Sequence, residues 1–102
     1  MTFEVYERAV IKWAHDRGIF DAGDPKAQCL KTVSEIGELA DNVAKGRSGA
    51  CRDDIGDIVV TLIILSKMLG TDVTECLIEA YDEIRGRQGK MVDGVFVKEG
   101  DV

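Results

Sequence analysis

The sequence predicts an all-α fold: a four-helix bundle completed by oligomerisation, with a short C-terminal β-hairpin tail. Apolar residues recur every three to four positions in four long stretches, and a single proline leaves those stretches uninterrupted. The last dozen residues differ, because short apolar runs there flank a tight-turn signal. With 102 residues, of which 45% are hydrophobic, we expect one globular domain that spans residues 1–102.

The first helix is predicted over residues 2–17, with Thr2 as its N-cap and Gly18 at its end. Residues 18–25 are predicted to form a loop. Asp24 stands directly before the proline of this loop, which is a typical start for the next helix.

The second helix is predicted over residues 26–45 and ends at Gly46. Ser48 is the expected cap of a third helix over residues 50–69. This helix contains a β-branched run that resembles a strand, but its continuity with the flanking segments favours a helix. Because it is apolar nearly all round, it must be covered on most sides, which predicts a homodimer or a tetramer.

The fourth helix is predicted to begin at Thr71 or Asp72 and to extend over residues 74–87. After it, Asp93-Gly94 lies between two short apolar pairs, which is the signal of a type I′ β-hairpin.

Four acidic side chains form two matched pairs on the second and third predicted helices. Glu35 and Glu38 lie three residues apart, as do Asp54 and Asp57, so the members of each pair share one helix face. In an antiparallel pair that rises ~1.5 Å per residue, all four fall at roughly one level. Clustered carboxylates raise their pKa values or bind a cation, and Mg²⁺ or Mn²⁺ suits their oxygens. The pattern favours a metal site over the alternative, a solvated acidic face.

Each acidic pair also encloses a glycine, Gly37 in one and Gly56 in the other. Glycine inside a helix costs ~1 kcal/mol relative to alanine. Two glycines at matched depth therefore favour a close approach of backbones beside the site.

Composition narrows the classes of partner. A net charge of −6 argues against a nucleic-acid partner. The three cysteines are widely spaced and lack the CxxC rhythm of zinc sites, so reduced thiols in a cytoplasmic protein are expected. The N-terminus is charged rather than signal-like, and the apolar stretch 58–65 is too short to cross a bilayer. We therefore expect a soluble chain with no membrane partner.

Four segments of the chain match a known family: WAHDRGIF, then Q-x-x-K before SEIGEL, then DDIGDIVV, then AYDEIRGRQGKMVDGVFVK. With these, nearly the whole chain resembles a MazG-like nucleotide pyrophosphohydrolase of the all-α NTP pyrophosphatase superfamily. The family pattern is ExxE, a spacer and ExxD on consecutive helices. Here it reads Glu35-x-x-Glu38, fifteen residues, then Asp54-x-x-Asp57.

The resemblance implies Mg²⁺-dependent (or Mn²⁺-dependent) hydrolysis of a nucleoside triphosphate to the monophosphate and pyrophosphate. The expected substrate is a deoxynucleotide. Glu35, Glu38, Asp54 and Asp57 would hold the metal, and Glu35 or Glu38 would act as the catalytic base toward the attacking water. The resemblance also implies substrate contacts, some of them from a neighbouring subunit. The expected phosphate contacts are Lys31, Arg87, Lys90 and Lys98, and Trp13 or Phe96 is expected to stack on the base. Gln28 and Asp82 are two further expected contacts.

Two departures from the family pattern keep alternatives open. Asp54 stands where the family usually has glutamate, and Ser34 stands where many members have another glutamate. One alternative is a catalytically weak or inactive helical oligomer that binds nucleotides or regulates a partner. Another is a different enzyme on the same scaffold, such as a phosphoribosyl-ATP pyrophosphohydrolase. Single residues are open too, since Trp13 fits a core position and Lys31 can pair with Glu35.

Overall fold

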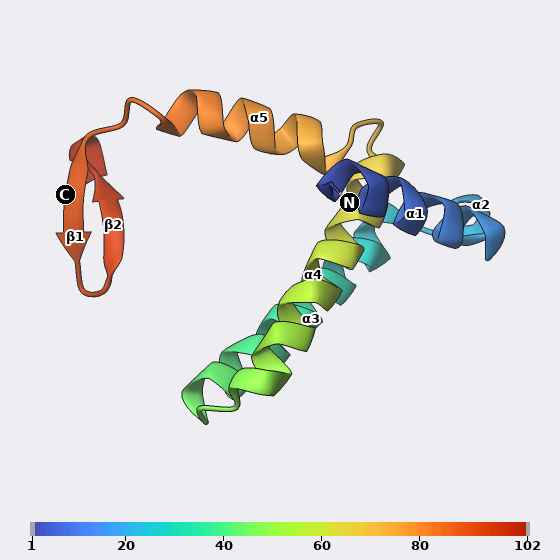
Figure 1. Ribbon diagram of the computed structural model, residues 1–102, viewed down its shortest axis with the longest axis horizontal. Helices are drawn as coiled ribbons and strands as arrows, with labels where there is room; N and C mark the ends of the chain where they lie inside the picture. Colours follow the sequence, from blue (N-terminus) through green and yellow to red (C-terminus); the bar gives the residue numbers. More distant parts are fainter. Residues whose placement is uncertain (1, 102) are drawn as a thin grey trace.

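The computed structural model describes residues 2–101, and these form five α-helices followed by a two-stranded hairpin (Figure 1). The four long helices and the hairpin predicted from the sequence are confirmed. The elements are α1 (Phe3–Asp16), α2 (Ile19–Ala22), α3 (Pro25–Ala44), α4 (Ser48–Met68), α5 (Val73–Ile84), β1 (Gly89–Val92), β2 (Val95–Lys98) and the 3-10 turn η1 (Glu99–Asp101).

Helices α3 and α4 lie side by side as an antiparallel pair and make the most extensive contact in the chain (Figure 1). Asp24 caps α3 as predicted, since its Oδ1 accepts a hydrogen bond from the Lys26 amide at 3.1 Å. Gly46 ends the helix with φ 69°, a left-handed conformation that favours glycine. The prediction that Ser48 caps α4 is wrong: Ser48 is the first residue of the helix, and Arg47 occupies the N-cap without a side-chain bond.

Hydroxyl and amide side chains join α3 to α4 along their buried seam. The Thr32 hydroxyl donates to Thr61 Oγ1 at 2.9 Å, and both residues are buried. The Thr61 hydroxyl donates in turn to the Ile58 carbonyl at 2.7 Å. Gln28 adds a bond from its Nε2 to the Thr61 carbonyl at 3.2 Å. These bonds satisfy the polar groups of the seam and fix the register of the two helices.

Helix α5 leaves the end of α4 and runs away from the α3–α4 pair, with the hairpin at its far end (Figure 1). Its first turn is anchored by two carboxylates. Asp72 caps it as predicted, accepting from the Glu75 amide at 2.7 Å. Glu7 of α1, only 5% exposed, accepts from the amides of Val73 at 2.9 Å and Thr74 at 3.2 Å. Three amides that a helix cannot satisfy internally therefore have acceptors.

The C-terminal hairpin turns at the predicted pair. Asp93 has φ 49° and Gly94 has φ 88°, and Val92 pairs with Val95 across the turn. Positive φ at both central residues is what a type I′ turn requires, so the predicted hairpin is confirmed.

The single chain leaves most of its apolar side chains uncovered. Among the described residues only Ala14, Ile63 and Ile64 are buried hydrophobic residues, fewer than the five buried polar or charged ones. The radius of gyration is 16.0 Å, whereas a compact chain of this length is expected at ~13 Å. The chain by itself is therefore an open arrangement and does not enclose a full core.

Three further expectations differ from the structure. The segment predicted as loop contains the one-turn helix α2, which follows Gly18 in a left-handed conformation. Trp13 is not a core residue, because its side chain is 46% exposed. No close backbone approach within the chain explains Gly37 or Gly56, since a Cβ at either would meet nothing within 4 Å. Short-range pattern cannot foresee which faces stay uncovered.

None of the helices within residues 2–101 combines the length and apolarity that crossing a membrane requires.

Candidate functional site

The four candidate metal ligands lie at matched depth on the α3–α4 pair. Glu38 and Asp54 are each eight residues from Gly46, and Glu35 and Asp57 are each eleven residues from it. At ~1.5 Å per residue, the two pairs stand about 12 Å and 16 Å from the turn. The structure confirms the antiparallel helix pair on which this count of residues rests.

The electrostatics of Glu35 indicate that the four carboxylates share one neighbourhood. Partial burial raises the pKa of Glu35 above its ordinary value, and the negative charges of Glu38, Asp57 and Asp54 raise it further. The positive charge of Lys31, one turn earlier on α3, opposes the shift. These like charges lie within Coulomb range of Glu35, and a cation among them would relieve the repulsion.

Asp54 is the deepest of the four acids, at 7% exposure, and it already has a partner. Asn42 Nδ2 donates to Asp54 Oδ2 at 2.6 Å, and Arg47 Nη1 donates to the side-chain oxygen Asn42 Oδ1 at 3.4 Å. The sequence places Asn42 on the polar stripe of α3, one turn after Glu38, but gives no reason to connect it with Asp54. This amide orients the Asp54 carboxylate and leaves Oδ1 available.

The carboxylates do not form a closed metal cage. Across residues 2–101, no three His, Cys, Asp or Glu side chains come together closely enough to hold one ion. Glu38 and Asp57 are exposed, Glu35 is half-buried and Asp54 is buried, so the cluster opens toward solvent on one side. The donor set is all oxygen and anionic, which fits a hard divalent cation that keeps part of its water shell.

Two residues predicted to contact the substrate, Lys31 and Gln28, lie on α3 with the acids, and their surroundings differ. Lys31 is exposed, and its charge reaches Glu35 without an ion pair of contact distance to it. Gln28 Nε2 donates a hydrogen bond to the Thr61 carbonyl oxygen, so this side chain helps to hold α3 against α4. Among residues 2–101, Lys31 therefore has no ion-pair partner, whereas the Gln28 side chain joins the two helices.

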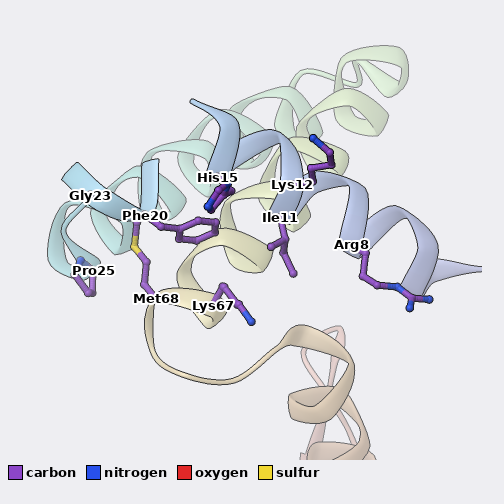
Figure 2. A pocket seen from close by; sticks show the side chains of 9 residues that line it. All are labelled: Arg8, Ile11, Lys12, His15, Phe20, Gly23, Pro25, Lys67 and Met68. Carbon is purple, nitrogen blue, oxygen red and sulfur yellow. The ribbon is translucent and has the colours of Figure 1, made fainter. Parts of the chain in front are cut away.

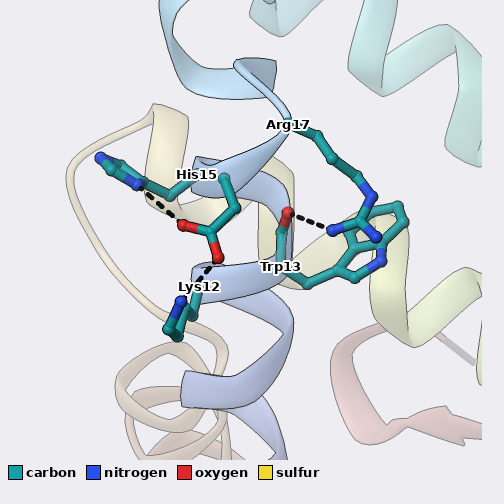
Figure 3. A network of polar contacts seen from close by, with 5 residues as sticks. Lys12, Trp13, His15 and Arg17 are labelled. Carbon is teal, nitrogen blue, oxygen red and sulfur yellow. Dashed lines mark hydrogen bonds and ion pairs between the residues drawn. The ribbon is translucent and has the colours of Figure 1, made fainter.

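Trp13, expected at the base of a nucleotide, belongs to a contact on α1. The Arg17 guanidinium lies 4.3 Å from the centre of its indole ring, and Arg17 Nη1 donates to the Trp13 carbonyl at 3.1 Å (Figure 3). The guanidinium covers one face of the exposed indole.

The remaining predicted substrate residues lie on α5 and the hairpin, which we call the arm (residues 73–98). The structure does not bring them to the acids of the same chain, because the arm runs away from α3 and α4 (Figure 1). Three of them form exposed ion pairs within the arm and η1: Asp82 with Arg85 at 3.9 Å, Arg87 with Glu83 at 3.6 Å, and Lys98 with Asp101 at 3.6 Å. Lys90 lies on β1 opposite Val97, and the ring of Phe96 packs over Gly89.

Replacing Glu35 by glutamine is expected to change how stability depends on pH when divalent cations are absent. A carboxyl whose folded pKa is raised contributes its full stability below its ordinary value of 4.5 and loses it as pH rises through the folded pKa. Thermal unfolding of the two proteins should therefore differ least at pH 4, and near pH 7 the variant should unfold at the higher temperature. Glu79→Gln on the exposed face of α5 is the control, and an equal effect of both substitutions would contradict the shared neighbourhood.

Comparison with known proteins gives one relative of unestablished function. A protein of Haemophilus phage HP1 (strain HP1c1), described as an uncharacterized 18.2 kDa protein in the rep-hol intergenic region, is 39% identical over 56 residues. The match covers 55% of this chain and 34% of the phage protein, so the match spans about a third of its relative's length. No family model matches the chain, and no solved structure matches it. The comparisons therefore assign no activity, and function has to be argued from the residues.

Proposed function

We propose that the protein is a Mg²⁺-dependent nucleoside triphosphate pyrophosphohydrolase, which converts a (deoxy)nucleoside triphosphate and water to the monophosphate and pyrophosphate. The observation that carries the proposal is the placement of two acid pairs at matched depth on the packed helices α3 and α4, and the raised pKa of Glu35 agrees with it. Four acids at matched depth on two packed helices are difficult to explain without a cation. The MazG-like sequence pattern supports the same chemistry.

The open shape of the cluster agrees with how Mg²⁺ binds in nucleotide enzymes. Mg²⁺ commonly uses one or two carboxylates and completes its shell with water and substrate phosphates. A closed cage is therefore not required. When bound, the ion would offset phosphate charge and polarise the attacking water.

The side chains of the cluster divide the remaining work. Glu38 and Asp57 are exposed and can meet an incoming ion, whereas Asn42 holds Asp54 in place beneath them. Glu35 or Glu38 would take the proton of the attacking water. Lys31, one turn before Glu35 on α3, would contact a phosphate oxygen.

Release of pyrophosphate tests the proposal directly. The protein is incubated with Mg²⁺ and the eight common ribo- and deoxyribonucleoside triphosphates, and phosphoribosyl-ATP is included to separate the related enzyme class. We expect turnover of at least one nucleotide, faster for deoxyribonucleotides than for ribonucleotides, and no turnover when the metal is chelated. An absence of turnover for every substrate would remove the enzyme proposal.

A second candidate function, a nucleotide-binding or regulatory module without turnover, is favoured by one observation. One oxygen of Asp54 is already committed to Asn42 at 2.6 Å, and aspartate reaches less far than the glutamate usual in the family. A module that binds nucleotides would show a raised unfolding temperature with Mg²⁺ and nucleotide but release no pyrophosphate. A regulator that no longer binds them would show neither effect.

We further propose that a second copy of the chain covers the arm in a homodimer, or in a tetramer built from it. The apolar side of α5 is exposed, with Leu77 at 63% and Tyr81 at 58%. This surface continues across the bend onto α4, where Leu62, Leu65 and Leu69 line an apolar hollow with Leu77. The arm of a second copy would also bring Arg87, Lys90 and Lys98 close to the acidic cluster of the first copy. The arm of the first copy itself runs away from that cluster (Figure 1).

Light scattering during gel filtration is expected to give a mass of at least twice the 11.2 kDa chain. Burying one leucine side chain contributes about 1.5–3 kcal/mol, so Leu77→Glu should raise the dissociation constant by more than tenfold. Glu79→Ala on the same helix is the matched control and should leave the mass unchanged. A wild-type protein that elutes as a monomer at all concentrations would exclude the proposal that a second copy covers the arm.

A further inference from the structure

A pocket of ≈ 640 Å³ lies between α1, α2 and the last turn of α4, apart from the acidic cluster (Figure 2). Lys67 and Met68, its residues on α4, come ten or more positions after Asp57, which is about 15 Å along the helix. The volume falls in the range typical of small-molecule sites, roughly 300–1,000 Å³. Neither the proposed hydrolysis nor the covered arm uses this pocket.

The floor of the pocket is apolar. Ile11 of α1, Phe20 of α2 and Met68 of α4 point into it from three elements (Figure 2). Gly23 makes room for the Met68 methyl, since a Cβ on Gly23 would collide with Met68 Cε and with the Ile19 carbonyl oxygen. The missing side chain therefore lets Met68 pack against the segment that follows α2 and form part of the apolar floor.

The rim of the pocket carries positive charge, although the chain has a net charge of −6. Every charged residue that lines it is basic, namely Arg8, Lys12 and Lys67, and His15 lies beside them. Lys12 is neutralised, because its Nζ lies 2.6 Å from Asp16 Oδ2 and lowers the pKa of that carboxyl (Figure 3). Lys67 and Arg8 form no ion pair within residues 2–101.

The nearest acids do not cancel those two charges at contact distance. An adjoining hollow is lined by Glu4, Glu7, Asp72 and Glu75 together with Arg8 and Lys67. Glu7 and Asp72 are occupied as acceptors of the first amides of α5. Lys67 and Arg8 thus keep donor hydrogens for an external acceptor.

We propose that this pocket binds a small organic anion: an aromatic or aliphatic body packs on Ile11, Phe20 and Met68, and a carboxylate, sulfonate or phosphate group meets Lys67, the cation next to this floor (Figure 2). A purely apolar occupant would leave Lys67 unused. A purely inorganic anion would leave the floor uncovered. Only a ligand with both parts complements the whole surface.

Paired fluorescent probes test the two halves of the proposal separately. The anionic probe is 8-anilinonaphthalene-1-sulfonate, and N-phenyl-1-naphthylamine is its neutral counterpart. Lys67→Gln should weaken the anionic probe roughly tenfold, the factor expected for one charge-assisted hydrogen bond, and should spare the neutral probe. Phe20→Ala should weaken both probes. If Lys67→Gln changes both probes equally, or neither, the anionic half of the proposal is wrong.

The apolar arm supplies the control for general stickiness. Leu77→Ala should leave the affinity of both probes unchanged, and a loss equal to that of Phe20→Ala would show that the probes report the arm surface instead.

A measurement on the unaltered protein avoids dependence on any variant that fails to fold. With methyl-labelled methionine, the anionic probe should shift the Met68 methyl resonance and leave that of Met91 on the hairpin in place. If the Met68 methyl resonance does not shift, the proposal is wrong. The proposal is also wrong if a second copy already fills the pocket, in which case the affinity for the probe would fall as protein concentration rises. Glu38→Gln should not alter probe binding, so failure here and failure of nucleotide hydrolysis are distinguishable.

Discussion

Replacing Glu38 by glutamine is expected to lower pyrophosphate release by roughly 10²–10⁴-fold, the range that removal of a positioned acid–base group produces. The substitution preserves the size of the side chain and removes its charge. Glu38 is exposed and its charge repels that of Glu35, so the substitution should not lower the unfolding temperature. Activity and stability therefore separate at this position.

The dependence on Mg²⁺ distinguishes the two roles open to Glu38. A ligand of the metal, once removed, raises the Mg²⁺ concentration needed for half-maximal activity. A base that takes the proton lowers the maximal rate and leaves that concentration unchanged. Glu79→Gln, which removes an equal charge from the exposed face of α5, should retain full activity. Equal turnover by wild type and Glu38→Gln would show that the acidic cluster does not carry the reaction.

Glu35→Gln offers an internal check on the same cluster. It should abolish most of the activity and yet raise the unfolding temperature near pH 7 in metal-free buffer, because it removes one of several repelling charges. Opposite effects on activity and stability are typical of functional sites. A structural carboxylate would lose both together.

Local chemistry determined the parts of the fold that the sequence could predict. Asp24 and Asp72 cap helices because their side chains reach amides two or three residues ahead, and Asp93-Gly94 turns because both residues accept positive φ. The depth of the four acids followed from counting residues about Gly46. Each of these inferences needs only neighbours in sequence or one antiparallel pairing.

The parts that failed depend on contacts between distant segments. Glu7 reads as one more charge on α1, but it caps a helix that begins 66 residues later. Asn42 likewise bonds to an acid on the other side of the turn. The direction of the arm depends on the bonds from Glu7 to the first turn of α5, and no periodicity in the sequence encodes them.

Glu7→Gln is expected to produce a large loss of stability. The Glu7 carboxylate is 5% exposed and accepts three hydrogen bonds: the amides of Val73 and Thr74 bond to Oε2, and the Thr74 hydroxyl bonds to Oε1 at 2.8 Å. A glutamine presents a donor where a second acceptor is needed and loses the charge that favours a helix N-terminus. Bonds to a charged acceptor contribute about 1.5–3 kcal/mol.

For a domain of about 100 residues each kcal/mol shifts the unfolding temperature by roughly 4–8 °C, so a decrease on the order of 10–20 °C is expected for Glu7→Gln. The measurement is thermal unfolding by circular dichroism at fixed protein concentration, since association also stabilises the native state. Glu4→Gln, one turn earlier on α1 and exposed, is the matched control and should change the temperature by no more than a surface substitution does.

Thr74→Val tests whether Glu7 acts through α5. It removes only the hydroxyl bond to Oε1, so its own loss should be smaller, about 1 kcal/mol. Once Glu7 is glutamine, the same substitution should cost less than it does alone, because residues that share a hydrogen bond are not additive. Fully additive losses, or equal unfolding temperatures for Glu7→Gln and Glu4→Gln, would mean that α5 is held by something other than this carboxylate. The orientation of the arm, and with it the surface offered to a second copy, would then need a different cause.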